Sequence, residues 1–194
     1  MPRPLRIDYH NAWHHVMNRG AARASIFQTN DDRACFLDCL AAAGSKTEIE
    51  IHGYCLMGNH FHLLVRSQAG RLSDFLRNLT GRYVHDYNRR WRSDGPLFRG
   101  RSSSIVLATD AHLLMASRYI HLNPVAAGLV DDAAKWPWSS AAAFMAYSSP
   151  PPWLVTSEIL AMFTSNSAAE DYAEFLREGV DAKTASIYQN HRWD

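Results

Sequence analysis

The chain has 194 residues, 47% of them hydrophobic and 20% charged, which is enough for one compact domain with an extension. No apolar run follows the first arginines and none reaches eighteen residues, so neither a signal peptide nor a membrane span is expected. The three cysteines, Cys35, Cys39 and Cys55, do not resemble a disulfide framework. These features predict a cytoplasmic protein.

The formal net charge of +1 hides an uneven distribution of charge along the chain. Residues 66–101 carry nine arginines and three acidic residues, a net charge of +6, whereas residues 131–194 have a net charge of −5. The chain has 17 arginines and only three lysines, and the planar guanidinium binds phosphate oxygens in a bidentate manner. A solvated helix face is the simpler interpretation of the basic region, but the clustering favours a nucleic-acid partner.

The first half of the chain predicts three strands and one helix. The loose alternation over 12–19 indicates a strand that ends at Gly20. Asp31 is a candidate N-cap for a helix that runs to about Gly44, where the glycine would end it. A second strand follows at 48–56, and Gly58-Asn59 turns the chain into a third strand, so the two should form an antiparallel hairpin.

The next residues predict a helix over 72–90, with apolar residues at three-to-four spacing, and a strand over 102–107. A further helix begins at Thr109 or Asp110 and runs to about Leu122, and Pro124 should close it. This order is that of an α+β, ferredoxin-like split βαβ fold, an antiparallel sheet with two helices on one face, followed by an additional helix.

We expect two parts in the chain, a domain over 1–130 and an extension over 131–194 that packs on it. The region 136–153 is rich in Pro, Ser and aromatic residues and is typical of a packed irregular segment. Two short acidic helices, near 156–163 and 167–178, should complete the extension.

His60 and His62, in the predicted third strand, are the strongest candidates for a metal site. Alternate residues of a strand face the same side of a sheet, so both imidazoles could hold one ion while Phe61 enters the core. Chance alone gives about half of one such match in a chain with ten histidines. Two histidines hydrogen-bonded at a sheet surface are the alternative interpretation.

Tyr119 and Asn123 could complete this site, because residues four apart share one face of a helix. A metal that polarises a scissile phosphate could make the Tyr119 hydroxyl an effective nucleophile, although its ordinary pKa is about 10. Asn123 would add a neutral oxygen ligand. Each has a simpler interpretation, a packed aromatic residue for Tyr119 and an ordinary helix end for Asn123-Pro124. Further histidines are expected to be structural or to contact nucleic acid: His14, His15, His52 and His121.

Several stretches in order along the first 140 residues resemble one family. They are HHVMNRG (14–20), DDRACF (31–36), HGYCLMGNHFHLLV (52–65), LFRGRSSS (97–104), RYIHLNPVAAGLV (118–130) and WPWSS (136–140). Together they are similar to the REP-associated tyrosine transposases, single-tyrosine, insertion-sequence-200-like members of the HUH nucleases.

The resemblance implies a function and roles for specific residues. It implies that His60 and His62 are metal ligands, with Asn123 as the third, and that Mg²⁺ or Mn²⁺ is the cofactor; two imidazoles alone would also suit Zn²⁺. It implies that Tyr119 attacks single-stranded DNA at palindromic repeat hairpins and forms a 5′-phosphotyrosine. The partners would be hairpins of repetitive extragenic palindromes, bound by a nucleoid-associated monomer or homodimer. The arginines expected to contact DNA are Arg19, Arg66, Arg71, Arg82, Arg99 and Arg101.

Two other functions are compatible with parts of this pattern. A DNA-hairpin-binding protein derived from a transposase would bind without cutting, but would have no reason to keep His60, His62, Tyr119 and Asn123 together. A phosphodiesterase that activates water would need an Asp or Glu base beside the histidines, and none is evident in 52–66.

Overall fold

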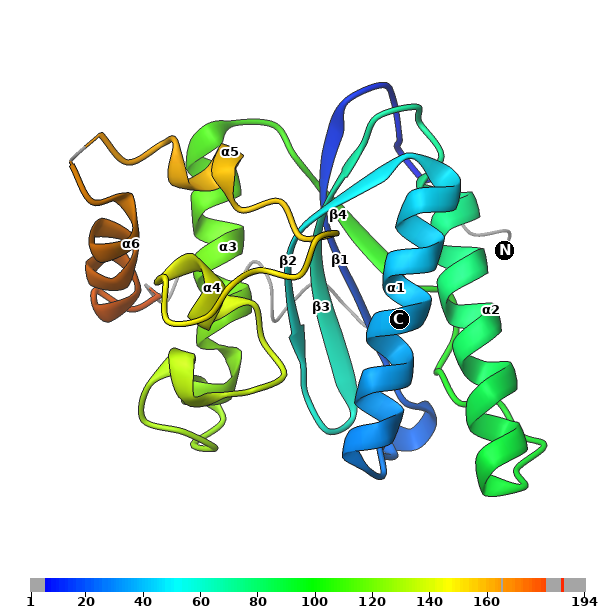
Figure 1. The fold of residues 1–194 in the computed structure, drawn as a ribbon. Helices are drawn as coiled ribbons and strands as arrows, with labels where there is room; N and C mark the ends of the chain where they lie inside the picture. The colour runs from blue at the N-terminus through cyan, green and yellow to red at the C-terminus, as the bar shows by residue number, and fades with distance from the viewer. Residues whose placement is uncertain (1–5, 165, 181–185, 187–194) are drawn as a thin grey trace.

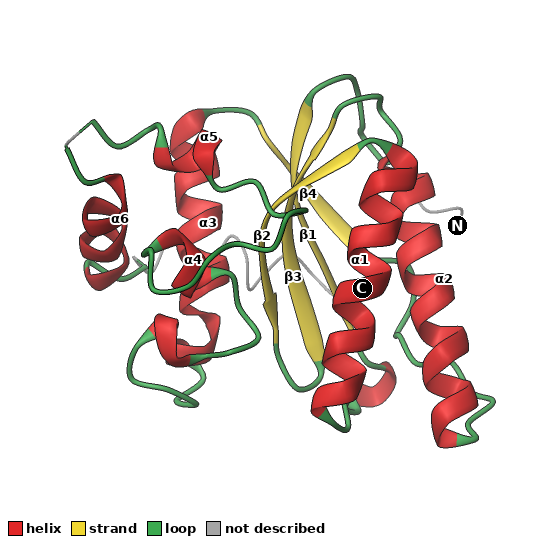
Figure 2. Ribbon diagram, in the orientation of Figure 1, coloured by secondary structure: helices red, strands yellow, loops and turns green. Residues whose placement is uncertain are grey.

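The computed structural model describes residues 6–164, 166–180 and 186, which form a four-stranded sheet with helices on both faces (Figure 1, Figure 2). The strands are β1 (Ala12–Arg19), β2 (Ile49–Leu56), β3 (His60–Ser67) and β4 (Ser103–Leu107). The longest helices are α1 (Asn30–Thr47), α2 (Leu72–Trp91) and α3 (Asp110–Ala126). The shorter elements are η1 (Ala21–Arg23), η2 (Ala133–Lys135), α4 (Ala141–Phe144), α5 (Ser157–Leu160) and α6 (Ala168–Arg177).

The strand order in the sheet is β2-β3-β1-β4, and every neighbouring pair is antiparallel. Helix α1 connects β1 to β2, and α2 connects β3 to β4. Both helices lie on the same face of the sheet (Figure 2). The predicted order of elements and the ferredoxin-like α+β fold are therefore confirmed.

The alternation of side chains along β3 divides the protein into two hydrophobic cores. Phe61, Leu63 and Val65 face α1 and α2 and are fully buried there. The same core takes the apolar residues of α2, whose three-to-four spacing aligns them along one stripe. Leu64 faces the other way, into a second core that α3 and the extension form. His60 and His62 share the face of Leu64, so the strand presents both imidazoles towards α3.

Helix α1 begins two residues earlier than the sequence predicted. Its N-cap is Thr29, not Asp31, because Thr29 and Asp32 form a reciprocal capping box. The Thr29 side chain accepts a hydrogen bond from the Asp32 N–H, and the Asp32 carboxylate accepts one from the Thr29 N–H at 3.0 Å. Arg90 also favours this start of α1, because its guanidinium lies 2.9 Å from the Asp32 carboxylate and fixes the position of that carboxylate.

The predicted end of α1 at Gly44 is also wrong. The helix continues to Thr47, and Glu48 takes the left-handed conformation that ends it, with φ of 56°. Gly44 instead allows a close approach of α1 to β2, because a Cβ there would lie 3.0 Å from the Ile49 carbonyl oxygen. Gly44 is therefore needed for packing and does not end the helix, and the sequence alone does not distinguish these two uses of glycine.

Pro124 does not close α3, contrary to the sequence expectation, but lies inside its last turn. A proline removes only its own N–H from the helix, and the following turn keeps its bonds: the N–H of Ala127 donates to the Asn123 carbonyl at 3.0 Å. Pro124 is also buried, so packing holds this turn in helical form. The helix therefore reaches Ala126, and Gly128, with φ of 67°, follows its end.

Residues 138–140 and 154–155 pack along the free edge of β2. The Leu56 N–H donates to the Trp138 carbonyl at 2.8 Å, and the Ser140 N–H donates to the Tyr54 carbonyl at 3.0 Å, which continues the sheet pairing by a short segment. Further on, α6 packs against α3, where His121 hydrogen-bonds both Tyr172 and Ser140. Among the described residues, no helix has the length and apolar character needed to cross a membrane.

Candidate active site

Strand β3 presents His60 and His62 on one face of the sheet, as the sequence predicted. Their ring centroids lie 5.1 Å apart, while Phe61 between them is fully buried in the opposite core. His62 is buried and His60 is half-buried at the end of the strand, next to the turn from β2. The two rings therefore lie close enough for their nitrogens to approach one ion, and one side remains open.

Helix α3 brings Tyr119 and Asn123 to the same place. The Tyr119 ring lies 5.6 Å from the His62 ring, centroid to centroid. The Asn123 side chain hydrogen-bonds with both His60 and Tyr119, and its Nδ2 donates to the Tyr119 backbone carbonyl at 2.8 Å. All four residues that the sequence singled out therefore converge, two from the sheet and two from the helix that covers it.

Hydrogen bonds determine which nitrogen of each histidine is available to a ligand. His60 Nδ1 lies 2.8 Å from Asn59 Oδ1, and Asn59 is oriented by its own Nδ2, which donates to the Arg23 carbonyl. His62 Nδ1 lies 2.9 Å from Nε2 of His15. If both Nδ1 atoms carry the proton in these bonds, both Nε2 atoms are left with a lone pair.

The environment keeps both imidazoles neutral near pH 7. Burial, with a smaller contribution from the positive charge of Arg19, lowers the pKa of His60 to about 4, although the hydrogen bond with Asn123 opposes this shift. Burial and the neighbouring His15 and His60 rings lower the pKa of His62 well below its ordinary value. Neutral imidazole is the form that coordinates a metal ion, so the site needs no proton loss to accept one.

Burial has the opposite consequence for the Tyr119 hydroxyl. It raises the pKa of Tyr119 above its ordinary value, and the hydrogen bond with Asn123 offsets only part of the shift. The phenol is therefore protonated at neutral pH. It becomes a competent nucleophile only when a nearby positive charge stabilises the phenolate or the developing charge on its target.

These donors fit a divalent metal ion. Two neutral nitrogens and one amide oxygen can bind it, once the ion takes the place of the hydrogen bond between the Asn123 side chain and His60. Mg²⁺ and Mn²⁺ favour oxygen and need more oxygen ligands than this set supplies. Phosphate oxygens of a bound nucleic acid are suitable for the remaining positions.

Three arginines, which we call the basic rim, lie beside His60: Arg19, Arg23 and Arg99. Arg19 is paired with His60 across the sheet, and its carbonyl accepts a hydrogen bond from the Arg99 N–H at 2.9 Å. Burial, and then repulsion from Arg23 and Arg99, lowers the pKa of Arg19. Such a concentration of positive charge next to a candidate metal site suits a phosphate backbone.

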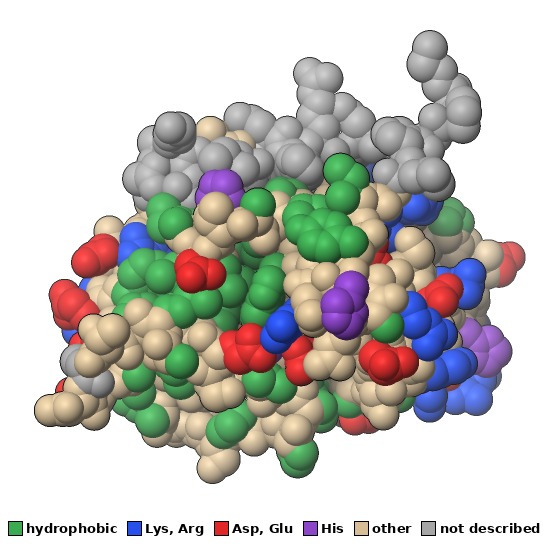
Figure 3. Space-filling model, turned by 90° about the horizontal axis from the view of Figure 1, so that it is seen from above, with side chains coloured by type: hydrophobic (Ala, Val, Ile, Leu, Met, Phe, Trp, Pro, Cys, Tyr) green, Lys and Arg blue, Asp and Glu red, His purple; other side chains and the backbone are tan. Residues whose placement is uncertain are grey.

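The other arginines predicted to contact DNA are Arg66, Arg71, Arg82 and Arg101, and the role of all six arginines stays a prediction. Arg66 lies at the far end of β3, six residues from His60 and so about 20 Å away, with its Nη1 2.9 Å from a Glu158 carboxylate oxygen. Arg71 lies 3.5 Å from Asp74, whereas Arg82 and Arg101 are exposed. Figure 3 shows Lys and Arg side chains gathered on the α1–α2 side of the upper face.

A cavity of about 650 Å³ adjoins the candidate site on the side of the extension. Tyr119 and Asn123 form part of its wall, and Leu176 and Arg177 of α6 face them. The extension thus contributes to the surroundings of Tyr119, which sequence reasoning had not anticipated.

His15 and Asn59 are the residues at this site whose contribution the sequence analysis missed. His15 was expected to be structural or to contact nucleic acid, yet it bonds His62 directly and its ring lies 5.8 Å from that of Tyr119. The signal was present, because His15 occupies a strand predicted in the same sheet. What the sequence lacked was the pairing of β1 with β3, which brings the two histidines together.

A match to a family model gives the class of protein to which this fold and site belong, the transposases. Residues 8–123 match the family model described as "Transposase IS200 like", and since this is more than half of the chain, the protein belongs to the IS200-like transposases.

Two solved structures show what its fold is similar to. A REP-associated tyrosine transposase bound to a REP hairpin matches with a TM-score of 0.64 at 16% identity, over 80% of this chain and 92% of that one. A protein from Deinococcus radiodurans described as a transposase matches with a TM-score of 0.44 at 14% identity, over 57% of this chain and 89% of that one. No curated protein matches the sequence.

Proposed function

We propose that this protein cuts and rejoins single-stranded DNA at palindromic hairpins, with Tyr119 as the nucleophile. The observation that carries the proposal is the convergence of Tyr119 and Asn123 on His60 and His62 in a member of a transposase family. The similarity of fold to a transposase bound to a REP hairpin supports a DNA hairpin as the substrate.

In this mechanism His60, His62 and Asn123 would hold a Mg²⁺ or Mn²⁺ ion, which would polarise the scissile phosphate and stabilise negative charge on the leaving oxygen. The Tyr119 oxygen attacks phosphorus, a new phosphorus–oxygen bond forms and the bond to the 3′-oxygen breaks. The tyrosine proton ends on that 3′-oxygen. The products are a 5′-phosphotyrosine and a free 3′-hydroxyl, and attack by a 3′-hydroxyl reverses the step and joins strands.

Other residues bind and position the DNA. The basic rim would contact phosphates on the strand that enters at His60, because its guanidiniums lie at the open end of the site. His15 and Asn59 hold the rings of His62 and His60 in the orientation that directs their Nε2 atoms towards one ion. The cavity beside Tyr119 could receive the nucleotide next to the cut.

The proposal is tested with a labelled single-stranded hairpin oligonucleotide and Mn²⁺, followed by a denaturing gel. The wild-type protein should give a covalent protein–DNA adduct that Tyr119→Phe abolishes. The matched control is Tyr9→Phe, which alters an exposed tyrosine that does not line the cavity beside Tyr119 and should leave the adduct intact. Cleavage that persists in Tyr119→Phe would contradict the tyrosine mechanism, and binding without any adduct would indicate a non-cleaving hairpin-binding protein.

A further inference from the structure

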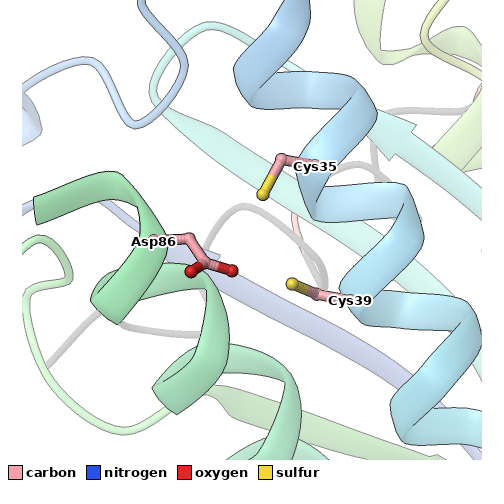
Figure 4. A group of neighbouring side chains, drawn as sticks. All are labelled: Cys35, Cys39 and Asp86. Carbon is pink, nitrogen blue, oxygen red and sulfur yellow. The ribbon is translucent and has the colours of Figure 1, made fainter. Parts of the chain in front are cut away.

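A second group of metal-binding side chains lies between α1 and α2, on the opposite face of the sheet from His60 and His62. Cys35 and Cys39 lie one turn apart on α1, and Asp86 approaches them from α2 (Figure 4). Each side chain offers one donor atom, and the three donor atoms lie within 4.8 Å of one another. Side chains from two different helices are thus directed at one point between them.

The donor set and its dimensions match those of a small thiophilic cation. In a tetrahedral Zn²⁺ site, sulfur at about 2.3 Å and oxygen at about 2.1 Å place neighbouring donors about 3.6–3.8 Å apart. The observed separations are therefore within about 1 Å of what an ion needs, a change that side-chain rotation can supply. Three protein ligands leave one position for water, and the partial exposure of Cys35 gives an ion access.

The simpler interpretation is that the cysteines only fill space, since Cys39 belongs to the hydrophobic core. It does not account for Asp86, a half-buried carboxylate that is directed at the two thiols and lies 3.5 Å from the Arg89 guanidinium. Burial first, and the Asp86 charge after it, raises the pKa of Cys35. Burial raises the pKa of Cys39 to about 12. A bound cation relieves this repulsion, and its binding releases one proton from each thiol.

We propose that Cys35, Cys39 and Asp86 form a site for Zn²⁺ or a similar thiophilic divalent cation, which links α1 to α2. Other charges face this site: Asp38 beside the thiols, and Arg82 and Arg90, which favour the thiolate form but repel a cation. The site is structural in kind, since the sheet separates α1 and α2 from α3, the helix that carries Tyr119 (Figure 1). A bound ion would hold together the helical layer that supports β3 from behind.

The test uses Co²⁺ as a spectroscopic probe, because cysteine thiolates bound to Co²⁺ give a charge-transfer band in the near ultraviolet. The titration is done on the wild type and on the His60→Ala, His62→Ala double variant, so that any ion bound there is accounted for. Both proteins should show the band, and Zn²⁺ should abolish it. Cys35→Ser and Cys39→Ser should remove it, and Asp86→Asn should weaken Co²⁺ binding at least about tenfold.

The third cysteine provides the matched control. Cys55 is buried in the other core, so Cys55→Ser should retain the band in full. Because serine at a buried position could unfold the protein, the thermal midpoint of each variant is measured without metal, and Cys35→Ser, at the more exposed position, decides the result if Cys39→Ser fails to fold. Zn²⁺ should raise the midpoint of the double histidine variant but not that of the same variant when it also carries Cys35→Ser. Absence of the band in the wild type, or its loss in Cys55→Ser or in the double histidine variant, overturns the proposal.

Discussion

His15 on β1 hydrogen-bonds His62 on the neighbouring strand β3, with 2.9 Å between Nε2 and Nδ1. Because β1 and β3 are the two central strands, this contact lies in the most rigid part of the sheet. It fixes the plane of the His62 ring, which lies 5.6 Å from the Tyr119 ring, centroid to centroid. The pairing of β1 with β3 thereby determines the hydrogen-bond partner of His62 Nδ1.

The first prediction concerns His15. Replacing it with alanine removes the partner of His62 Nδ1, so the His62 ring can rotate and metal affinity should fall by about 10- to 100-fold. The Mn²⁺ concentration that gives half-maximal adduct formation measures this loss, and saturating Mn²⁺ should restore much of the activity. His14→Gln is the control, since His14 lies on the other face of the same strand and bonds Asp8. An unchanged Mn²⁺ requirement in His15→Ala would show that the contact does not orient a ligand.

The second prediction compares Arg99, in the basic rim, with Arg66, at the other end of β3. Arg99→Ala should weaken hairpin binding for any sequence and reduce the slope of log affinity against log salt by about one. In contrast to the expectation from the sequence that Arg66 contacts DNA, Arg66→Gln should leave that slope unchanged, because the Arg66 guanidinium already contacts Glu158 and Glu50. It should instead lower the free energy of unfolding by about 1 kcal/mol or less. Binding isotherms at several salt concentrations measure the slopes, and equal slopes for both variants would contradict this division.

The third prediction concerns the start of α1. Thr29→Ala removes the side-chain half of the capping box and should lower the free energy of unfolding by about 1 kcal/mol. Asp31→Ala, two residues on, changes an acidic residue in the first turn and should cost less than about half of that. Urea denaturation of both variants gives the comparison. A larger loss for Asp31→Ala would place the cap where the sequence alone had suggested it.

The elements of this fold could be predicted from the sequence because most of them carry strong local patterns. The apolar spacing of α2 and the alternation of β3 match what the structure shows. The alternation also predicted correctly that His60 and His62 share one face of the sheet. The predicted ends of α1 and α3 were wrong, because tertiary contacts decide them. Arg90 holds the Asp32 carboxylate that caps α1 together with Thr29, Gly44 allows a close approach to β2, and the last turn of α3 at Pro124 is buried.

At the site, the residues could be predicted but their supporting contacts could not. Family resemblance led to Tyr119 and Asn123, their spacing placed them on one helix face, and the structure brings them to the histidine pair. The contacts of His15 and Asn59 depend on strand register and on a turn conformation, neither of which a local pattern specifies. The same holds for Cys35, Cys39 and Asp86, since only the packing of α1 on α2 brings the carboxylate to the thiols.

The last prediction is a loss of stability in acid, caused by histidines that the fold keeps neutral. Burial lowers the pKa of His121 to about 3 and is the main cause that lowers those of His52 and His60 to about 4. In the unfolded chain a histidine has a pKa of about 6.5. Between these values the unfolded state binds protons that the native state does not, so stability is present above pH 6.5 and decreases as the pH falls towards 4.

Each such histidine can contribute up to about 1.4 kcal/mol per pH unit in that range. Urea denaturation at pH 7.5, 6.0 and 5.0 should therefore show a steep decrease in the free energy of unfolding. His121→Gln keeps a polar group near Tyr172 and Ser140 but cannot titrate, so its profile should be flatter than that of the wild type. His112→Gln, at an exposed position of α3, is the matched control. If His121→Gln loses stability with acid as steeply as the wild type, the buried imidazole of His121 is not a source of the acid sensitivity.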